Sequence, residues 1–101
     1  MRFKNPYITI KQKIELLQRW ILVHSYLYYE LNDNVVDDKT YDNNAQQLMR
    51  YKKKYKADYN NSRYYSIFYD YDGSTGMHLI DRLDSELIEK IKFDIRFLKK
   101  D

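Results

Sequence analysis

Two clusters of aromatic and acidic residues in one short stretch of the chain carry the residue types that bind small molecules. The six residues are His24, Tyr28, Tyr29, Asp38, Tyr41 and Asp42. Tyrosine rings stack on other flat rings, and more strongly on rings that carry a positive charge. Carboxylates accept hydrogen bonds from hydroxyl and amide groups. If the two clusters lie side by side, these residue types predict a pocket for a flat, cationic ring that carries hydroxyl groups.

The spacing of the apolar residues predicts two helices that would position these clusters. Over about residues 10–31, apolar residues recur at steps of three or four around more than half of the helix circumference, so we expect a central, mostly buried helix. Residues 32–34 are turn-forming, and Asp37 or Asp38 can cap a second helix over about residues 38–57. Because the loop between them is short, we expect an antiparallel hairpin, in which the end of the first helix lies beside the start of the second.

In that hairpin the two clusters line one small pocket at the helix junction. A nicotinamide nucleotide has a cationic pyridinium ring and ribose hydroxyls, so it fits the residue types of the pocket. His24 and the N-terminal end of the second helix could also tolerate a phosphate. The residues alone leave a second interpretation open, because tyrosines and aspartates near a helix junction also serve packing and capping.

The spacing within this stretch matches a longer pattern. His24-x-Tyr-x-Tyr-Tyr is followed by eight residues and then, without a gap, by Asp38-x-x-Tyr41-Asp42. This pattern, over about residues 11–52, resembles the small N-terminal helical segment of NAD-dependent bacterial DNA ligases. In those ligases the segment holds the nicotinamide mononucleotide (NMN) half of NAD and orients it as the leaving group when the enzyme is adenylated.

Taken residue by residue, the resemblance implies a binding site for NMN or NAD. Contacts to the nucleotide are implied for Tyr28, Tyr29, Asp38, Tyr41 and Asp42, with His24 supporting or lining the same site. The chain departs from the ligase pattern at three positions: Tyr29 stands where some ligases have histidine, Asn34 where proline is common, and Asp37 where serine or proline is common. The additional carboxylate makes the site more acidic and less favourable for a phosphate.

The catalytic motif of those ligases is not matched. Their separate nucleotidyltransferase domain contains a Lys-x-Asp-Gly motif, whereas the Asp-Gly here lies in Asp70-Tyr71-Asp72-Gly73, with aspartate in place of the lysine. Without that lysine no lysyl adenylate can form, and the rest of the chain is too short for such a domain. We therefore expect a module that binds NAD or NMN and is not an enzyme.

Composition restricts the remaining classes of protein. With 101 residues, 44% of them hydrophobic, we expect a single domain over residues 1–101 with one modest core. The absence of cysteine excludes thiol nucleophiles, disulfides and thiolate metal sites, and two distant histidines do not suffice for a multi-histidine metal site. No apolar run approaches the roughly 18 residues of a membrane span, and charge interrupts the N-terminus too early for a signal peptide. We therefore expect a cytoplasmic protein without membrane contact.

The second half of the chain, residues 58–101, is expected to cover the apolar face of the helical hairpin at residues 11–57. Residues 63–70 are rich in aromatic side chains and predict a strand, with residues 77–80 as its return strand. A final helix is predicted over about residues 84–99. The predicted fold class is therefore mainly α or small α+β: an antiparallel helical hairpin, a short aromatic β-hairpin and a C-terminal helix.

Three functions fit these observations and differ in what they require. The first is a non-catalytic module that binds a nicotinamide nucleotide, which needs the five implied contact residues to be free and to converge on a cavity. The second is a small protein of the phage or mobile-element type that binds and modulates a host protein, such as a ligase, an NAD-using enzyme or a defence factor. It needs an exposed apolar or aromatic patch. The third is nucleic-acid binding through the basic cluster at residues 50–56, which the modest net charge of +3 does not favour.

Overall fold

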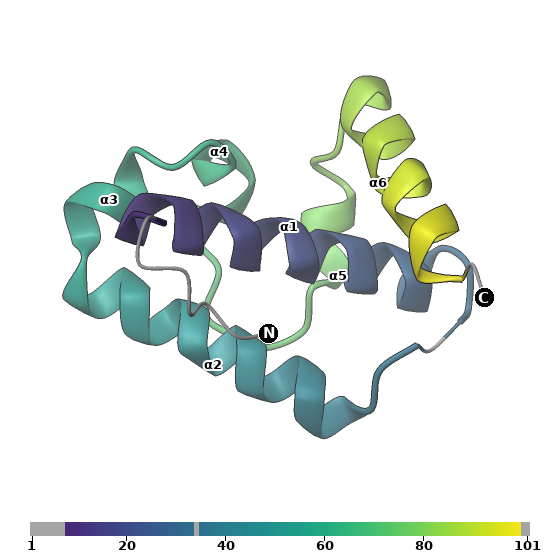
Figure 1. The fold of residues 1–101 in the computed structure, drawn as a ribbon, viewed down its shortest axis with the longest axis horizontal. Coiled ribbons are helices and arrows are strands. Elements are labelled where there is room, and N and C mark those ends of the chain that lie inside the picture. Colours follow the sequence, from purple (N-terminus) through teal and green to yellow (C-terminus); the bar gives the residue numbers. More distant parts are fainter. Residues whose placement is uncertain (1–7, 34, 100–101) are drawn as a thin grey trace.

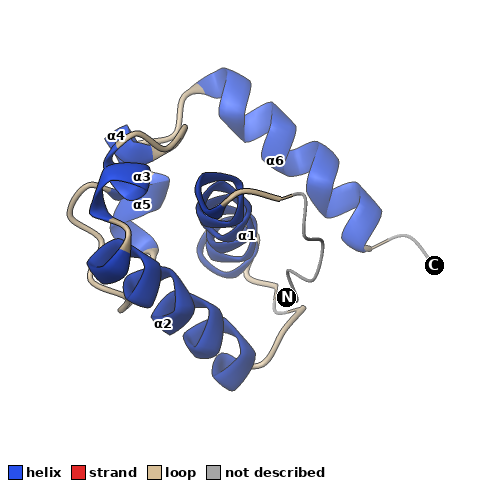
Figure 2. Cartoon of the chain, turned by 60° about the vertical axis from the view of Figure 1, so that its left-hand side comes forward, coloured by secondary structure: helices blue, strands red, loops and turns tan. Residues whose placement is uncertain are grey.

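The computed structural model describes residues 8–33 and 35–99, and this part of the chain contains helices and no strand. In chain order the helices are α1 (Ile10–Tyr29), α2 (Asp38–Lys54), α3 (Lys56–Asn60), α4 (Tyr65–Phe68), α5 (Met77–Ile80) and α6 (Ser85–Leu98). α1 contacts α2, α3, α5 and α6 (Figure 1). Figure 2 shows α1 at the centre, with the other helices around it. None of the described helices is long and apolar enough to cross a membrane.

α1 is largely buried because its apolar residues cover a wide arc of the helix. Its fully buried apolar side chains are Ile14, Leu17, Ile21 and Leu22. The helix begins with a capping box: Gln12 N donates to Thr9 Oγ1 at 3.1 Å, and Thr9 N donates to Gln12 Oε1 at 2.9 Å. The prediction of a central, mostly buried helix is therefore confirmed.

α2 runs antiparallel to α1 and packs against it (Figure 1). Its first turn is capped by Asp37, whose Oδ1 accepts a hydrogen bond from Thr40 N at 2.8 Å. The helix ends at Lys54, earlier than the predicted residue 57, because Tyr55 adopts non-helical angles (φ −125°, ψ 61°) before α3 begins. The cap and the short loop thus place the start of α2 beside the end of α1, as the sequence predicts.

The predicted aromatic β-hairpin is wrong, because residues 63–70 and 77–80 contain the short helices α4 and α5 instead of strands. The buried side chains of the first segment and its end are Tyr64, Ile67, Phe68 and Tyr71. Their steps of three, one and three follow a helical period, whereas a half-buried strand buries every second residue. In the second segment the adjacent residues Leu79 and Ile80 are both buried. Within the described residues, the fold is all-α and not α+β.

Two buried tyrosines stabilise the end of α4 and the segment that joins it to α5. Tyr59 OH donates to the Phe68 carbonyl at 2.8 Å, and Tyr71 OH donates to the Ser74 carbonyl at 3.0 Å. Both side chains are fully buried, and burial raises the pKa of each phenol above its ordinary value. Because both hydroxyls are hydrogen-bonded, the rings pack in the core without an unpaired polar group.

The basic cluster at residues 50–56 closes α2 and is partly engaged within the molecule. Residues 52–54 are lysines in the last turn of the helix, where positive charge interacts favourably with the helix dipole. Lys52 Nζ donates to the Tyr71 carbonyl at 2.8 Å and lies over the Tyr59 ring. Through Lys52, the basic cluster therefore helps to hold α2 against the segments that contain Tyr59 and Tyr71.

Candidate functional site

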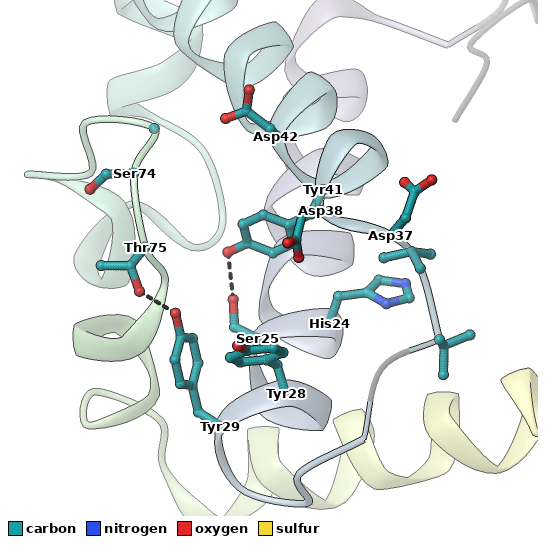
Figure 3. Close-up of a pocket in the computed structure, with 13 residues that line it drawn as sticks. His24, Ser25, Tyr28, Tyr29, Asp37, Asp38, Tyr41, Asp42, Ser74 and Thr75 are labelled. Atoms are coloured by element: carbon teal, nitrogen blue, oxygen red, sulfur yellow. Dashed lines mark hydrogen bonds between the residues drawn. The ribbon is translucent and has the colours of Figure 1, made fainter.

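A pocket of about 310 Å³ lies where the C-terminal end of α1 meets the N-terminal end of α2 (Figure 3). The loop that precedes α5, at residues 73–75, forms its third wall. All six residues singled out from the sequence line the pocket: His24, Tyr28, Tyr29, Asp38, Tyr41 and Asp42. The structure therefore brings every predicted site residue together around one cavity.

α1 contributes a buried imidazole and two tyrosines to the pocket. His24 is 6% exposed, and its ring centroid lies 4.2 Å from that of Trp20. Burial lowers the pKa of His24 to about 4, so the imidazole is neutral at pH 7. Tyr28 is half exposed, and the Tyr29 ring packs edge-on against it with a centroid distance of 4.8 Å. α1 thus supplies aromatic surface without a positive charge.

α2 contributes two carboxylates and a third tyrosine. Asp38 and Asp42 are exposed and four residues apart, so they share one face of the helix. Within the described part of the chain, neither carboxylate forms a hydrogen bond or an ion pair, so both are available to ligand donors. Tyr41 OH and Ser25 Oγ form a hydrogen bond of 2.8 Å (Figure 3), and burial raises the pKa of the Tyr41 phenol. This hydrogen bond connects α2 to α1 at the pocket.

The third wall comes from the second half of the chain and was not predicted. Thr75 Oγ1 is hydrogen-bonded to Tyr29 OH, which connects the loop to the end of α1 (Figure 3). Gly73 has a φ of +86°, a conformation that favours glycine. At Gly76 a Cβ would lie 2.2 Å from Ser25 Oγ, so glycine permits the close approach of the loop to α1. Both glycines of the chain lie in this turn, and that concentration was the signal in the sequence for a closely packed loop.

The pocket combines apolar and aromatic surface with acidic groups. Val35 and Val36 line it from the loop between α1 and α2, although the sequence analysis did not assign them to the site. Asp37 also lines it, and the hydrogen bond from Thr40 lowers the pKa of the Asp37 carboxyl. Because three aspartates and no lysine or arginine are among the described lining residues, the pocket favours a cation. In the part of the chain that the structure describes, no group of three or more His, Asp or Glu side chains could hold a metal ion.

The fold and the pocket define an all-α module with an aromatic, acidic site at a helix junction. Over 46 residues, 46% of this chain, the sequence is 44% identical to the DNA ligase of Pseudothermotoga lettingae. The chain therefore contains a segment related to a DNA ligase. The match covers 7% of that ligase, so the chain spans only a small part of the length of the enzyme that it matches. No family model and no solved structure matches the chain.

Proposed function

We propose that this chain is a non-catalytic module that binds a nicotinamide nucleotide, NMN or NAD, in the pocket between α1 and α2. The observation that carries the proposal is the convergence on one pocket of six side chains that were singled out from the sequence. The similarity to a DNA ligase over 46 residues supports a module of ligase type.

The chemistry of the pocket fits the nicotinamide half of the dinucleotide. Tyr28 and Tyr41 offer aromatic surface to the cationic pyridinium ring. Asp38 and Asp42 offer acceptors for the ribose hydroxyls and for the carboxamide N–H groups. The volume of about 310 Å³ lies at the lower end of the roughly 300–1,000 Å³ of small-molecule sites. NMN would therefore fill the pocket, and the adenylate half of NAD would extend beyond it.

Isothermal titration calorimetry of the purified chain with NMN, NAD and AMP tests the proposal. We expect saturable binding of NMN and NAD and none of AMP, because AMP lacks the cationic ring. Asp42→Ala should weaken binding by about 2 kcal/mol, or roughly 30-fold, because it removes a charged hydrogen-bond acceptor. Glu89→Ala is the matched control, because it removes an exposed carboxylate of α6 that does not line the pocket. If the folded chain bound neither NMN nor NAD at millimolar concentration, the proposal would be wrong.

A second candidate function, binding to a protein partner, is favoured by an apolar groove between α1 and α6. The groove is lined by Leu16, Trp20 and Val23 of α1 and by Phe93, Phe97 and Leu98 of α6, among others. Phe93 and Phe97 are 52% and 62% exposed, and contiguous exposed apolar surface is typical of protein contact sites. In a titration with a ligase or another NAD-using enzyme, this function predicts binding that Phe97→Ser abolishes and Asp42→Ala preserves. Equal binding by both variants would exclude the groove as the contact site.

A further inference from the structure

We infer that the pocket selects the phosphate-free cation nicotinamide riboside over its phosphate ester NMN. This inference rests on the proposed function, because it names the form of the nicotinamide ligand that the same pocket binds best. The two ligands share the pyridinium ring, the carboxamide and the ribose. The phosphate converts a ligand with one positive charge into a ligand with net negative charge at neutral pH, so the charges around the pocket decide between them.

The charged side chains that line the described pocket are all acidic. Asp37, Asp38 and Asp42 approach it from the N-terminal end of α2 and its cap (Figure 3), and all three are exposed. A pyridinium cation is attracted by each of these carboxylates, whereas a phosphate is repelled by each of them.

One backbone N–H group at the N-terminus of α2 already donates to a carboxylate of this chain. Backbone N–H groups at a helix N-terminus bind anions, but Thr40 N in the first turn of α2 donates to Asp37 Oδ1 at 2.8 Å. A phosphate at this position would have to displace that carboxylate and would lie beside Asp38. The cap of α2 therefore places a carboxylate where a ligand phosphate would approach the N-terminus of the helix.

The other polar side chains of the α1 wall do not supply a positive charge. His24 is buried against Trp20, and burial lowers its pKa to about 4, so it is a neutral group at pH 7. Tyr29 OH is already hydrogen-bonded to Thr75 Oγ1. The α1 residues that line the pocket therefore offer a phosphate no cation to compensate the aspartates.

Two lysines on neighbouring segments do not make the charge around the pocket positive. Lys99 Nζ forms an ion pair with Asp33. Lys39 is exposed on α2, and its effect on the pKa of Asp37 is smaller than that of the Thr40 hydrogen bond. Exposed charges of this kind are screened over about 10 Å at 0.1 M salt, so the carboxylates that line the pocket dominate at the ligand.

Calorimetric titrations of the whole chain with nicotinamide riboside and with NMN test the inference. At low salt, about 50 mM, we expect nicotinamide riboside to bind about tenfold more tightly than NMN. Because the difference is electrostatic, the ratio of the two dissociation constants should fall toward one at about 0.5 M salt.

Asp37→Ser is the diagnostic variant, because serine keeps an acceptor for the helix cap and removes one negative charge. In this variant we expect the preference for nicotinamide riboside to fall to about threefold. Glu89→Gln is the matched control. It removes one negative charge from α6, where the side chain is 71% exposed and outside the pocket, and it should leave the ratio unchanged.

The outcomes separate the inference from the proposed function. If NMN bound as tightly as nicotinamide riboside, the inference would be overturned and the proposed function would stand. The inference would also be overturned if Asp37→Ser left the ratio unchanged, or if Glu89→Gln changed it equally, because the pocket carboxylates would then not cause the selectivity. If neither ligand bound to the folded chain, both the inference and the proposed function would fail.

Discussion

One methyl group added at Gly76 tests how closely the loop before α5 packs on the helix junction. A Cβ at this position would lie 2.2 Å from Ser25 Oγ, 2.6 Å from Tyr41 OH and 3.1 Å from Ser25 Cβ. Gly76 has a φ of −91°, which any residue can adopt, so Gly76→Ala changes the packing and not the backbone strain. The substitution must therefore break the hydrogen bond between Ser25 and Tyr41 or displace the loop that carries Thr75.

The cost of Gly76→Ala can be worked from these contacts. Overpacking of a well-filled site costs about 1–3 kcal/mol, and the loss of one hydrogen bond costs about 1 kcal/mol. We expect the free energy of unfolding to fall by about 2–4 kcal/mol. For a domain of this size, the melting temperature should fall by roughly 10–30 °C. Urea unfolding and thermal melts followed by circular dichroism measure both quantities.

A double-mutant cycle with Ser25→Ala isolates the steric part of the effect. When the Ser25 hydroxyl is absent, the closest clash with the new methyl group is removed. Gly76→Ala should therefore cost at least about 1 kcal/mol less in the Ser25→Ala background than in the wild type. An equal cost in both backgrounds, or a melting temperature within about 2 °C of the wild type, would refute the close packing of this loop.

Other contacts make equally specific predictions. An NMR titration should give His24 a pKa near 4, below its ordinary 6.5; the unfolded state then binds the proton first, so stability falls as the pH drops from 6.5 toward 4. A measured pKa above about 6 would contradict the burial of His24. Arg82 donates to both Asp70 oxygens at 2.7 and 2.9 Å and lowers the pKa of Asp70 from 3.8 to about 2. This ion pair should stabilise the fold above the ordinary pKa of 3.8 and lose its contribution as the pH falls toward 2. Asp70→Asn should therefore lower the free energy of unfolding more above pH 3.8 than near pH 2, and an equal loss at both pH values would contradict the ion pair. Ile91→Ala should cost about 2–5 kcal/mol and Phe97→Ala under about 0.5 kcal/mol, because Ile91 is fully buried and Phe97 is 62% exposed. Equal costs in urea unfolding would show that the faces of α6 are assigned wrongly.

The long helices were predictable because their signals are local. The apolar spacing over residues 10–31 has one interpretation, and α1 spans Ile10–Tyr29. Asp37 and Asp84 each accept a backbone hydrogen bond from the residue three positions on, as N-caps do. Such signals need no knowledge of the rest of the molecule.

The second half of the chain was harder to predict because propensity and burial disagree there. The aromatic residues 63–70 have high strand propensity, but Phe68 and Tyr71 pack in the core and stack edge-on at 5.4 Å. A helical step of three residues places both rings on the same buried side, whereas in a strand residues three positions apart point to opposite faces. Tertiary packing therefore overrides the local preference.

The candidate site was predictable only where it is built from neighbouring residues. The six predicted side chains lie at the end of α1 and the start of α2, which a short loop connects. Their spacing in the sequence is therefore enough to predict that they lie around one pocket. The loop at residues 73–75 is different, because its contact joins Tyr29 to Thr75, 46 residues apart in the sequence. No pattern in a single sequence specifies such a distant contact.

Binding of a nicotinamide nucleotide in the pocket is tested most directly by a titration of isotope-labelled protein with NMN, followed by two-dimensional NMR. We expect saturable chemical shift changes that are concentrated at Tyr28, Asp42 and Thr75, which line this pocket and not the groove between α1 and α6. Shifts concentrated at Phe97 would place the ligand in the groove between α1 and α6 and would contradict binding in the pocket. The absence of any shift at millimolar NMN would contradict it as well.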